Sequence, residues 1–313
     1  MRNNIDGLTT ERVNESTRNI DTLDSLEIVT LINEEDKKVA DSVEKVLPQI
    51  AGAVDAVAER FERGGRIIYC GAGSSGRMGT LDAVELTPTY SVPPERAFGL
   101  LAGGEQAMYL AVEGAEDSEE LAVEDLKRVK LKPEDCVIGI AASGRTPYTT
   151  AALKYGKETG ALTISITCNQ EGAMAKLADI SIAPVVGAEV INGSTRMKAG
   201  TAQKMVVNML STAVMVRLGK VYQNYMVYMQ PTNEKLIMRA VHMIEEITGT
   251  DKDAAFKALQ KADQNVAAAI VMIECGCERE LAKKALLESG GRVRAAINAL
   301  KKGAYADKTG NGT

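Results

Sequence analysis

The spacing of apolar and polar residues changes character along the 313-residue chain. Residues 34–63 carry apolar side chains at three- and four-residue steps, which predicts helix, and Pro48 is expected to divide or kink it. From Arg66 to Val186, short apolar runs alternate with helical segments. From 233 to 302 the pattern is wholly helical, and it is interrupted at Gly249, Gly276 and Gly290-Gly291.

The middle region predicts five strands separated by helices. The predicted strands are 66–70, 96–101, 136–141, 162–168 and 180–184. The predicted helices are 75–86, 105–113, 117–128, 147–159 and 170–177. Nearly continuous apolar strands that alternate with helices indicate a parallel sheet covered on both faces. The sequence therefore predicts an α/β fold: a three-layer α/β/α sandwich with a five-stranded parallel sheet, flavodoxin-like, plus a small C-terminal helical domain.

The flanking regions complete the expected organisation. Residues 1–30 are polar and read as an arm that lies on a partner or another subunit, and 195–218 predict a long helix buried against the sheet or a second subunit. We expect four parts, which are an N-terminal arm with helices (1–63), a domain built on the sheet (64–232), a C-terminal helical bundle (233–302) and a disordered tail (303–313).

Composition excludes several classes of protein. The formal charge of −5 and the pI near 5.3 argue against a nucleic-acid or anionic membrane surface. No apolar stretch approaches the roughly eighteen residues of a membrane span, and the first residues lack the apolar core of a signal peptide. The five cysteines form no paired framework, which favours a reducing cytoplasm. Since His242 is the one histidine, a zinc site of several histidines is excluded, and acid–base chemistry falls to carboxylates.

Two loops rich in Gly and Ser follow predicted strands. Gly71-Ala-Gly-Ser74-Ser75-Gly-Arg77 follows the strand at 66–70, and Ser143-Gly-Arg-Thr146 follows the strand at 136–141. Each loop sets hydroxyls and backbone N–H groups at a helix N-terminus, where the helix dipole favours an anion. Both lie at carboxyl ends of strands, where doubly wound sheets bind ligands. The pair predicts one phosphorylated small molecule held between two helices.

The first loop also matches the dinucleotide fingerprint Gly-x-Gly-x-x-Gly. A dinucleotide site needs an acid at the end of the second strand, but that strand runs into Gly103-Gly104, and Glu105 is poorly placed. No Gly-Lys-Ser/Thr follows, so the loop is not a Walker A loop. A sugar phosphate is therefore favoured.

At two further helix N-termini, the polar residues can serve either to bind an anion or simply to cap the helix. Thr146, followed by Pro147, can cap its helix as well as bind phosphate. Ser194, Arg196 and Lys198 open the long helix, where an anion contact and a capped, solvated turn are equally consistent with the sequence.

Two acidic segments are candidates for acid–base chemistry. Glu85 ends the helix that the first loop begins, and Glu113 and Glu116 lie between two predicted helices. Their small and apolar neighbours can raise a carboxyl pKa toward the range useful for proton transfer.

Six motifs together resemble the N-acetylmuramic acid 6-phosphate etherase family, a bacterial branch of the sugar isomerase (SIS) domain superfamily. They are Gly71–Arg77, Leu81–Glu85, Ala111–Asp117, Ala141–Pro147, Gly193–Thr201 and Thr232–Lys235. The resemblance runs from about residue 8 to 300 and implies cleavage of the D-lactyl ether of N-acetylmuramate 6-phosphate, giving N-acetylglucosamine 6-phosphate and D-lactate. It further implies recycling of cell-wall sugars in the cytoplasm, no metal or organic cofactor, and a homodimer with sites near the subunit interface.

The resemblance also assigns roles. It matches the family's two acid–base glutamates to Glu85 and Glu116. In the ring-opened sugar the C1 aldehyde acidifies the C2 proton, which Glu116 is expected to remove, with Glu113 as local competitor. Glu85 is expected to protonate the departing lactate and then deprotonate water. The substrate-binding candidates are Ser74, Ser75, Ser143, Thr146 and Ser194.

One position departs from the family pattern, because Tyr228 stands where members usually carry an acid. Two other functions remain open: an aldose–ketose phosphate isomerase, and a sugar-phosphate-binding regulator without turnover. The presence of both Glu85 and Glu116 favours an enzyme.

Overall fold

The computed structural model describes residues 8–303, and the chain folds into two compact units. The sheet unit comprises the chain up to Val84 together with Pro93–Ala213, and the helical unit comprises Glu85–Val92 and the chain from Val214. The division at 64 and 233 stays a prediction, and residues 214–232 pack as part of the helical unit. The expected tail lies outside the described residues from position 304 onward.

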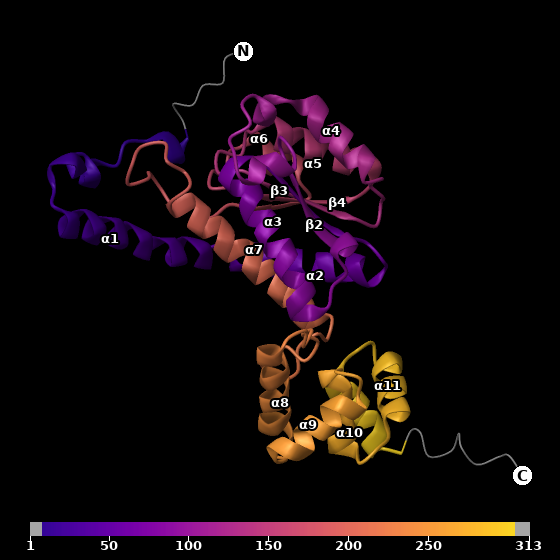
Figure 1. Ribbon diagram of the computed structural model, residues 1–313. Coiled ribbons are helices and arrows are strands. Elements are labelled where there is room, and N and C mark those ends of the chain that lie inside the picture. Colours follow the sequence, from indigo (N-terminus) through magenta and orange to yellow (C-terminus); the bar gives the residue numbers. More distant parts are fainter. Residues whose placement is uncertain (1–7, 304–313) are drawn as a thin grey trace, which may run out of the picture. The chain divides into compact units, whose positions relative to one another are not determined.

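The sheet unit contains five parallel strands in the order β2-β1-β3-β4-β5 (Figure 1). The strands are β1 Ile67–Gly71, β2 Ala97–Leu101, β3 Cys136–Ile140, β4 Leu162–Ile166 and β5 Ile180–Ile182. Ile67 of β1 pairs with Ala97 on one side and with Cys136 on the other, so the connections leaving β1 and β2 reverse direction there. This confirms the predicted parallel sheet and places its switch point between β1 and β3.

Helices cover both faces of this sheet (Figure 1). The helices of the sheet unit are α1 Ser25–Glu44, α2 Leu47–Glu62, α3 Gly73–Tyr90, α4 Glu119–Arg128, α5 Pro147–Thr159, α6 Ala173–Leu177 and α7 Lys198–Arg217, and α1 extends away from the sheet. Ile68, Cys70 and Val137 pack with α4 and α5 on one face. Pro48 is the second residue of α2, which confirms that this proline divides the predicted helix at 34–63.

A buried carboxylate ties α3 and α7 to the other face. Asp82 on α3 accepts hydrogen bonds from Tyr69 Oη of β1 (2.8 Å), and from Asn208 Nδ2 (2.8 Å) and Ser211 Oγ (3.0 Å) of α7. Burial raises the pKa of Asp82, although all three donors oppose the shift. The first turn of α3, with Ser74 and Ser75, is therefore carried by a helix anchored to two neighbours.

Two expectations about local structure are wrong. The predicted helix at 105–113 is only the short 3-10 helix η5, Glu105–Met108, and the carbonyls of Ala107 and Met108 accept hydrogen bonds from the Arg77 side chain. The expected arm also ends early, since α1 begins at Ser25 with a capping box between Asp24 and Glu27.

The described part of the arm packs on its own chain. The Thr9 N–H donates to Asn169 Oδ1 (2.9 Å), and Thr17 Oγ1 donates to the carbonyl of Val190 (2.8 Å). Short 3-10 turns lead from residue 8 into α1.

The helical unit is built around α10, Val266–Cys275, whose residues 266–272 are all buried. The other helices are α8 Glu234–Thr248, α9 Lys252–Lys261, α11 Arg279–Glu288 and α12 Val293–Lys301. Gly249 and Gly276 end α8 and α10 in left-handed conformations, which confirms the predicted breaks. A further break at Asp263 and Gln264 has φ of +53° and +62°, and no glycine signals it in the sequence.

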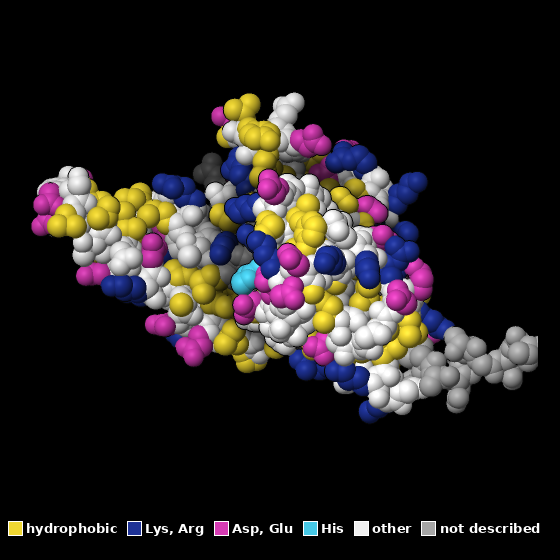
Figure 2. All heavy atoms as spheres, turned by 60° about the horizontal axis from the view of Figure 1, so that its bottom comes forward, with side chains coloured by type: hydrophobic (Ala, Val, Ile, Leu, Met, Phe, Trp, Pro, Cys, Tyr) yellow, Lys and Arg dark blue, Asp and Glu magenta, His cyan; other side chains and the backbone are white. Residues whose placement is uncertain are grey.

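Two residues singled out in the sequence lie in this unit. His242 is exposed on α8, among acidic and basic side chains (Figure 2). The Tyr228 hydroxyl donates to the carbonyl of Gly291 (2.6 Å) while Lys220 lies over its ring, so Tyr228 holds the α11–α12 connection. Within the described residues, no helix is long and apolar enough to cross a membrane.

Candidate active site

A cavity of about 340 Å³ opens at the carboxyl ends of β1 and β3, where the sheet order reverses. It unites the two loops predicted from the sequence. Its polar lining consists of Glu11, Ser74, Ser75, Glu116, Asp117, Ser143, Arg145, Thr146 and Thr195. Four of the five predicted substrate-binding residues and one of the two predicted catalytic residues therefore meet in one place.

Glycines make the first loop possible. A Cβ on Gly71 would lie 2.8 Å from the Gly76 Cα, and one on Gly76 would lie 2.4 Å from Leu101 Cδ1. Because neither is present, β1 turns directly into α3 and exposes the first N–H groups of the helix, which have no partner within it. Ser75 Oγ donates to Gln203 Oε1 of α7 (2.8 Å), so α7 helps to orient this turn.

The second loop leaves a hydroxyl uncommitted to capping. Thr146 is the residue before α5, but its side chain makes no capping hydrogen bond, and Pro147 takes the first helical position. Ser143 Oγ accepts a hydrogen bond from the Arg145 N–H (3.2 Å), which shapes the turn, and Gly144 has φ of +68°. The Thr146 hydroxyl can therefore serve a ligand at a helix N-terminus.

The structure separates the candidate acids. Glu116 lies on the 3-10 helix η6, Ala115–Asp117, and lines the cavity, whereas Glu113 does not. Glu85 lies on α3 ten residues after Ser75, which corresponds to about 15 Å of helix axis. It is exposed and is absent from the described lining of the cavity. Within one chain, Glu116 therefore lies in the cavity beside the two Gly/Ser loops, and Glu85 does not.

The lining also contains Glu11, which the sequence assigned to the polar N-terminal arm. Glu11 belongs to the 3-10 helix η1, Thr9–Glu11, which Asn169 fastens to the site by accepting from Thr9 and donating to the Ala142 carbonyl (2.9 Å). Nothing in the periodicity of the polar arm signals that contact. At the start of α7, Thr195 lines the cavity and its neighbour Ser194 does not.

Lys198, which the sequence offered as a candidate anion contact, forms an ion pair with Glu35. Its ammonium lies 2.7 Å from Glu35 Oε2, and both side chains are buried. Burial alone would raise the pKa of Glu35, but hydrogen bonds from Lys198 and Lys38 outweigh it and lower the pKa from 4.5 to about 2. The pair joins α1 to the start of α7, and Lys198 is not among the described lining residues of the cavity.

The other reactive groups suit packing better than catalysis. Burial raises the pKa of Cys136 and of Cys168 to about 12, so neither thiol is ionised near neutral pH. Within the described residues no group of three or more His, Cys, Asp or Glu side chains is arranged to hold a metal ion. The arrangement around the cavity suits an anionic ligand bound by hydroxyls and helix N-termini, with carboxylates for proton transfer.

The chain is similar to several known proteins. A model of the glucokinase regulatory protein N-terminal SIS domain matches residues 49–157, and a SIS domain model matches residues 112–213. N-acetylmuramic acid 6-phosphate etherase 1 of Enterococcus faecalis is 62% identical over 290 residues, covering 93% of this chain and 97% of the relative. N-acetylmuramic acid 6-phosphate etherase of Lactobacillus johnsonii is 54% identical over 295 residues, covering 94% and 99%. The solved structure of a phosphoheptose isomerase from Francisella tularensis superposes with a TM-score of 0.46 at 17% identity, over 61% of this chain and 98% of that chain.

Proposed function

The chain belongs to the N-acetylmuramic acid 6-phosphate etherase family, and we propose that its cavity cleaves the D-lactyl ether of N-acetylmuramate 6-phosphate. The products are N-acetylglucosamine 6-phosphate and D-lactate. The observation that carries this proposal is the meeting of both hydroxyl-rich loops with Glu116 in one cavity. The free thiols of the described cysteines agree with a reducing cytoplasm, where we place the reaction.

The proposed chemistry is an elimination followed by an addition. Glu116 takes the C2 proton of the open-chain aldehyde, the C3–O bond breaks, and the electron pair leaves with the lactate oxygen. Glu85 protonates that oxygen, then takes a proton from the water that attacks C3, and Glu116 returns its proton to C2. The sum is one ether plus one water giving one alcohol and lactate, so neither a redox agent nor a cofactor enters the balance.

The phosphate is assigned to the helix N-termini. Ser74 and Ser75 at the start of α3, and Ser143 and Thr146 before α5, surround the cavity together with the N–H groups of both first turns. Hydroxyl and backbone donors at two converging helix ends suit a dianion. Holding the phosphate there leaves the sugar carbons to extend toward Glu116.

We further propose a homodimer in which Glu85 of the partner subunit completes the site. Leu81, one helical turn before Glu85 on the same face of α3, and Val84, the residue before Glu85, leave 51% and 62% of their surface exposed. Large exposed apolar side chains of this kind mark surfaces that another chain covers. The same covering would bring an acid to a cavity that its own chain supplies only with Glu116.

Mixing two inactive variants tests this arrangement. Glu85→Ala and Glu116→Ala homodimers, allowed to exchange subunits, form heterodimers with one intact site if the two acids come from different chains. Activity should then recover to about a quarter of the wild-type level. If both acids come from one chain, no heterodimer holds an intact site, and the mixture stays inactive.

The reaction itself is tested by incubating the enzyme with N-acetylmuramate 6-phosphate in deuterated water. D-lactate release with deuterium at C2 of the amino sugar supports the proposal. Deuterium exchange with a ketose product and no lactate would indicate an isomerase, and ligand binding without either would indicate a regulator. Lactate lost in Glu85→Ala with C2 exchange retained would support the division of roles.

A further inference from the structure

Arg77 does not face the candidate site, although it closes the motif that forms the first loop. Its Nε donates to the carbonyls of Ala107 (3.0 Å) and Met108 (3.1 Å), and its Nη2 donates to those of Ala107 (2.6 Å) and Leu110 (3.3 Å). Arg77 is also absent from the described lining of the cavity. The guanidinium therefore grips the backbone of one segment, the stretch at and after η5.

These carbonyls need a donor from outside the segment. η5 spans only four residues, and the N–H groups of Tyr109 and Leu110 both bond to the carbonyl of Gln106. The carbonyls of Ala107 and Met108 at the end of this 3-10 helix thus point beyond it, as at any helix end. A planar cationic donor satisfies several such acceptors at once, which a single-point cation does less well.

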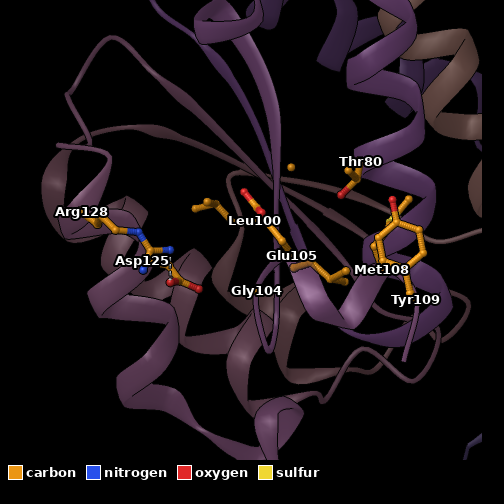
Figure 3. A pocket seen from close by; sticks show the side chains of 10 residues that line it. Thr80, Leu100, Gly104, Glu105, Met108, Tyr109, Asp125 and Arg128 are labelled. Carbon is orange, nitrogen blue, oxygen red and sulfur yellow. Dashed lines mark hydrogen bonds and ion pairs between the residues drawn. The ribbon is translucent and has the colours of Figure 1, made fainter. Parts of the chain in front are cut away.

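Packing holds the same segment only loosely. Gly103 and Gly104 precede it and Gly114 follows it, each with positive φ, while Tyr109 and Leu110 leave 88% and 67% of their surface exposed. Behind η5 lies a hollow of about 390 Å³. In Figure 3, Met108 and Tyr109 lie on one side of this hollow and the ion pair of Asp125 with Arg128 on the other. The hydrogen bonds of Arg77 therefore hold a segment that has few packing contacts of its own.

Through these hydrogen bonds, Arg77 links the first turn of α3 to the segment that precedes Glu116. On α3 it lies two and three residues after Ser75 and Ser74, which are assigned to the phosphate, and the gripped segment leads directly to Glu116. We infer that Arg77 is a positioning residue, which fixes the Glu116-bearing segment relative to the phosphate-binding turn of α3. This inference rests on the proposed function, which assigns the phosphate to the first turn of α3 and the C2 proton to Glu116.

Arg77→Met, which keeps much of the apolar stem, tests the inference with two matched variants. Arg77→Lys restores a cation that reaches fewer carbonyls. Arg96→Met is the control, because Arg96 likewise donates to backbone carbonyls, those of Phe61 (2.7 Å) and Gly65 (2.9 Å), but it precedes β2 and so lies at the amino ends of the strands, away from the cavity at their carboxyl ends. Lactate release gives kcat and KM, inhibition by inorganic phosphate reports the phosphate site, and amide hydrogen exchange reports the segment.

We expect Arg77→Met to lower kcat by about 10- to 100-fold, because a small misplacement of a catalytic group has effects of that size. The phosphate inhibition constant should stay within about twofold, since the helix N-termini are untouched. The kinetic isotope effect with substrate deuterated at C2 should rise, Arg77→Lys should recover part of kcat, and Arg96→Met should keep the wild-type kcat.

An unchanged kcat in Arg77→Met would overturn the inference, as would a parallel loss of phosphate inhibition or an equal loss of kcat in Arg96→Met. Hydrogen exchange separates this failure from failure of the proposed function. If the wild type released no lactate, faster exchange over residues 103–118 in Arg77→Met would still support the positioning contact. Unchanged exchange there would refute it.

Discussion

Replacing Lys198 by methionine is expected to destabilise the sheet unit by about 3 kcal/mol at pH 7. Methionine retains most of the buried stem, so the change removes mainly the ammonium that lies 2.7 Å from Glu35 Oε2. Glu35, only 5% exposed, is left without its buried partner. Loss of one member of a buried ion pair costs about 3–5 kcal/mol in proteins, because the remaining charge is poorly solvated.

The pKa of Glu35 supplies a second route to the same magnitude. Its fall from 4.5 to about 2 corresponds, at about 1.36 kcal/mol per pKa unit, to about 3 kcal/mol of preference for the charged form. Lys38 also lies 2.5 Å from Glu35 Oε1 and remains in the variant, which favours the lower end of the range. Because the pKa is lower in the folded chain, this stabilisation is complete above about pH 4.5 and is lost as the pH falls toward 2.

Urea unfolding followed by circular dichroism suits the measurement, because the chain has no Trp. The midpoint should fall at pH 7 in Lys198→Met, and the difference from wild type should shrink between about pH 4.5 and 2. The double variant Glu35→Gln/Lys198→Met should recover part of the loss, since it leaves no unpaired buried charge. Equal midpoints for wild type and Lys198→Met at pH 7, or a difference that does not shrink in acid, would refute this reasoning.

Three further predictions concern single side chains. Thr146→Val should raise the KM for N-acetylmuramate 6-phosphate by about tenfold or more, through loss of a hydrogen bond to a charged group, while Tm stays constant because no capping bond is lost; a lowered Tm would contradict this. Glu116→Gln should abolish C2 deuterium exchange and Glu113→Gln should leave it nearly unchanged, and the reverse would move the base to Glu113. Tyr228→Phe should lower the stability of the helical unit by about 1 kcal/mol, seen as a lower Tm, because the carbonyl of Gly291 loses its donor; a loss of lactate release at full stability would instead implicate Tyr228 in catalysis.

Local signals were sufficient for the sheet and its two loops. Apolar runs of strand length, each ending in small and hydroxyl residues, set β1 and β3 and the turns after them, since these features depend on neighbours a few residues away. The same kind of signal failed at 105–113. There the residue types fit a helix, but Arg77, far away in the sequence, donates to the carbonyls of Ala107 and Met108 where the helix was expected to continue.

Long-range pairing explains the other differences. Lys198 looked like a ligand for an anion because its partner, Glu35, lies far away in the sequence. Glu11 was assigned to an arm that lies on a partner or another subunit, because Asn169, which holds that arm beside the cavity, is 160 residues away from Thr9. Neither spacing nor composition reports such a contact.

The sequence by itself determined the fold class, the two hydroxyl-bearing turns and the family, because short-range patterning and long ordered motifs carry that information. Only the tertiary structure decided which acid meets the turns. Glu85 and Glu116 are equally plausible as residues, yet the rise of α3 carries Glu85 about 15 Å beyond Ser75, while η6 returns Glu116 to the cavity. The distance between groups that are remote in sequence is set by packing. Packing also places Arg77, which the sequence assigned to the first loop, in contact with the backbone of the segment that leads to Glu116.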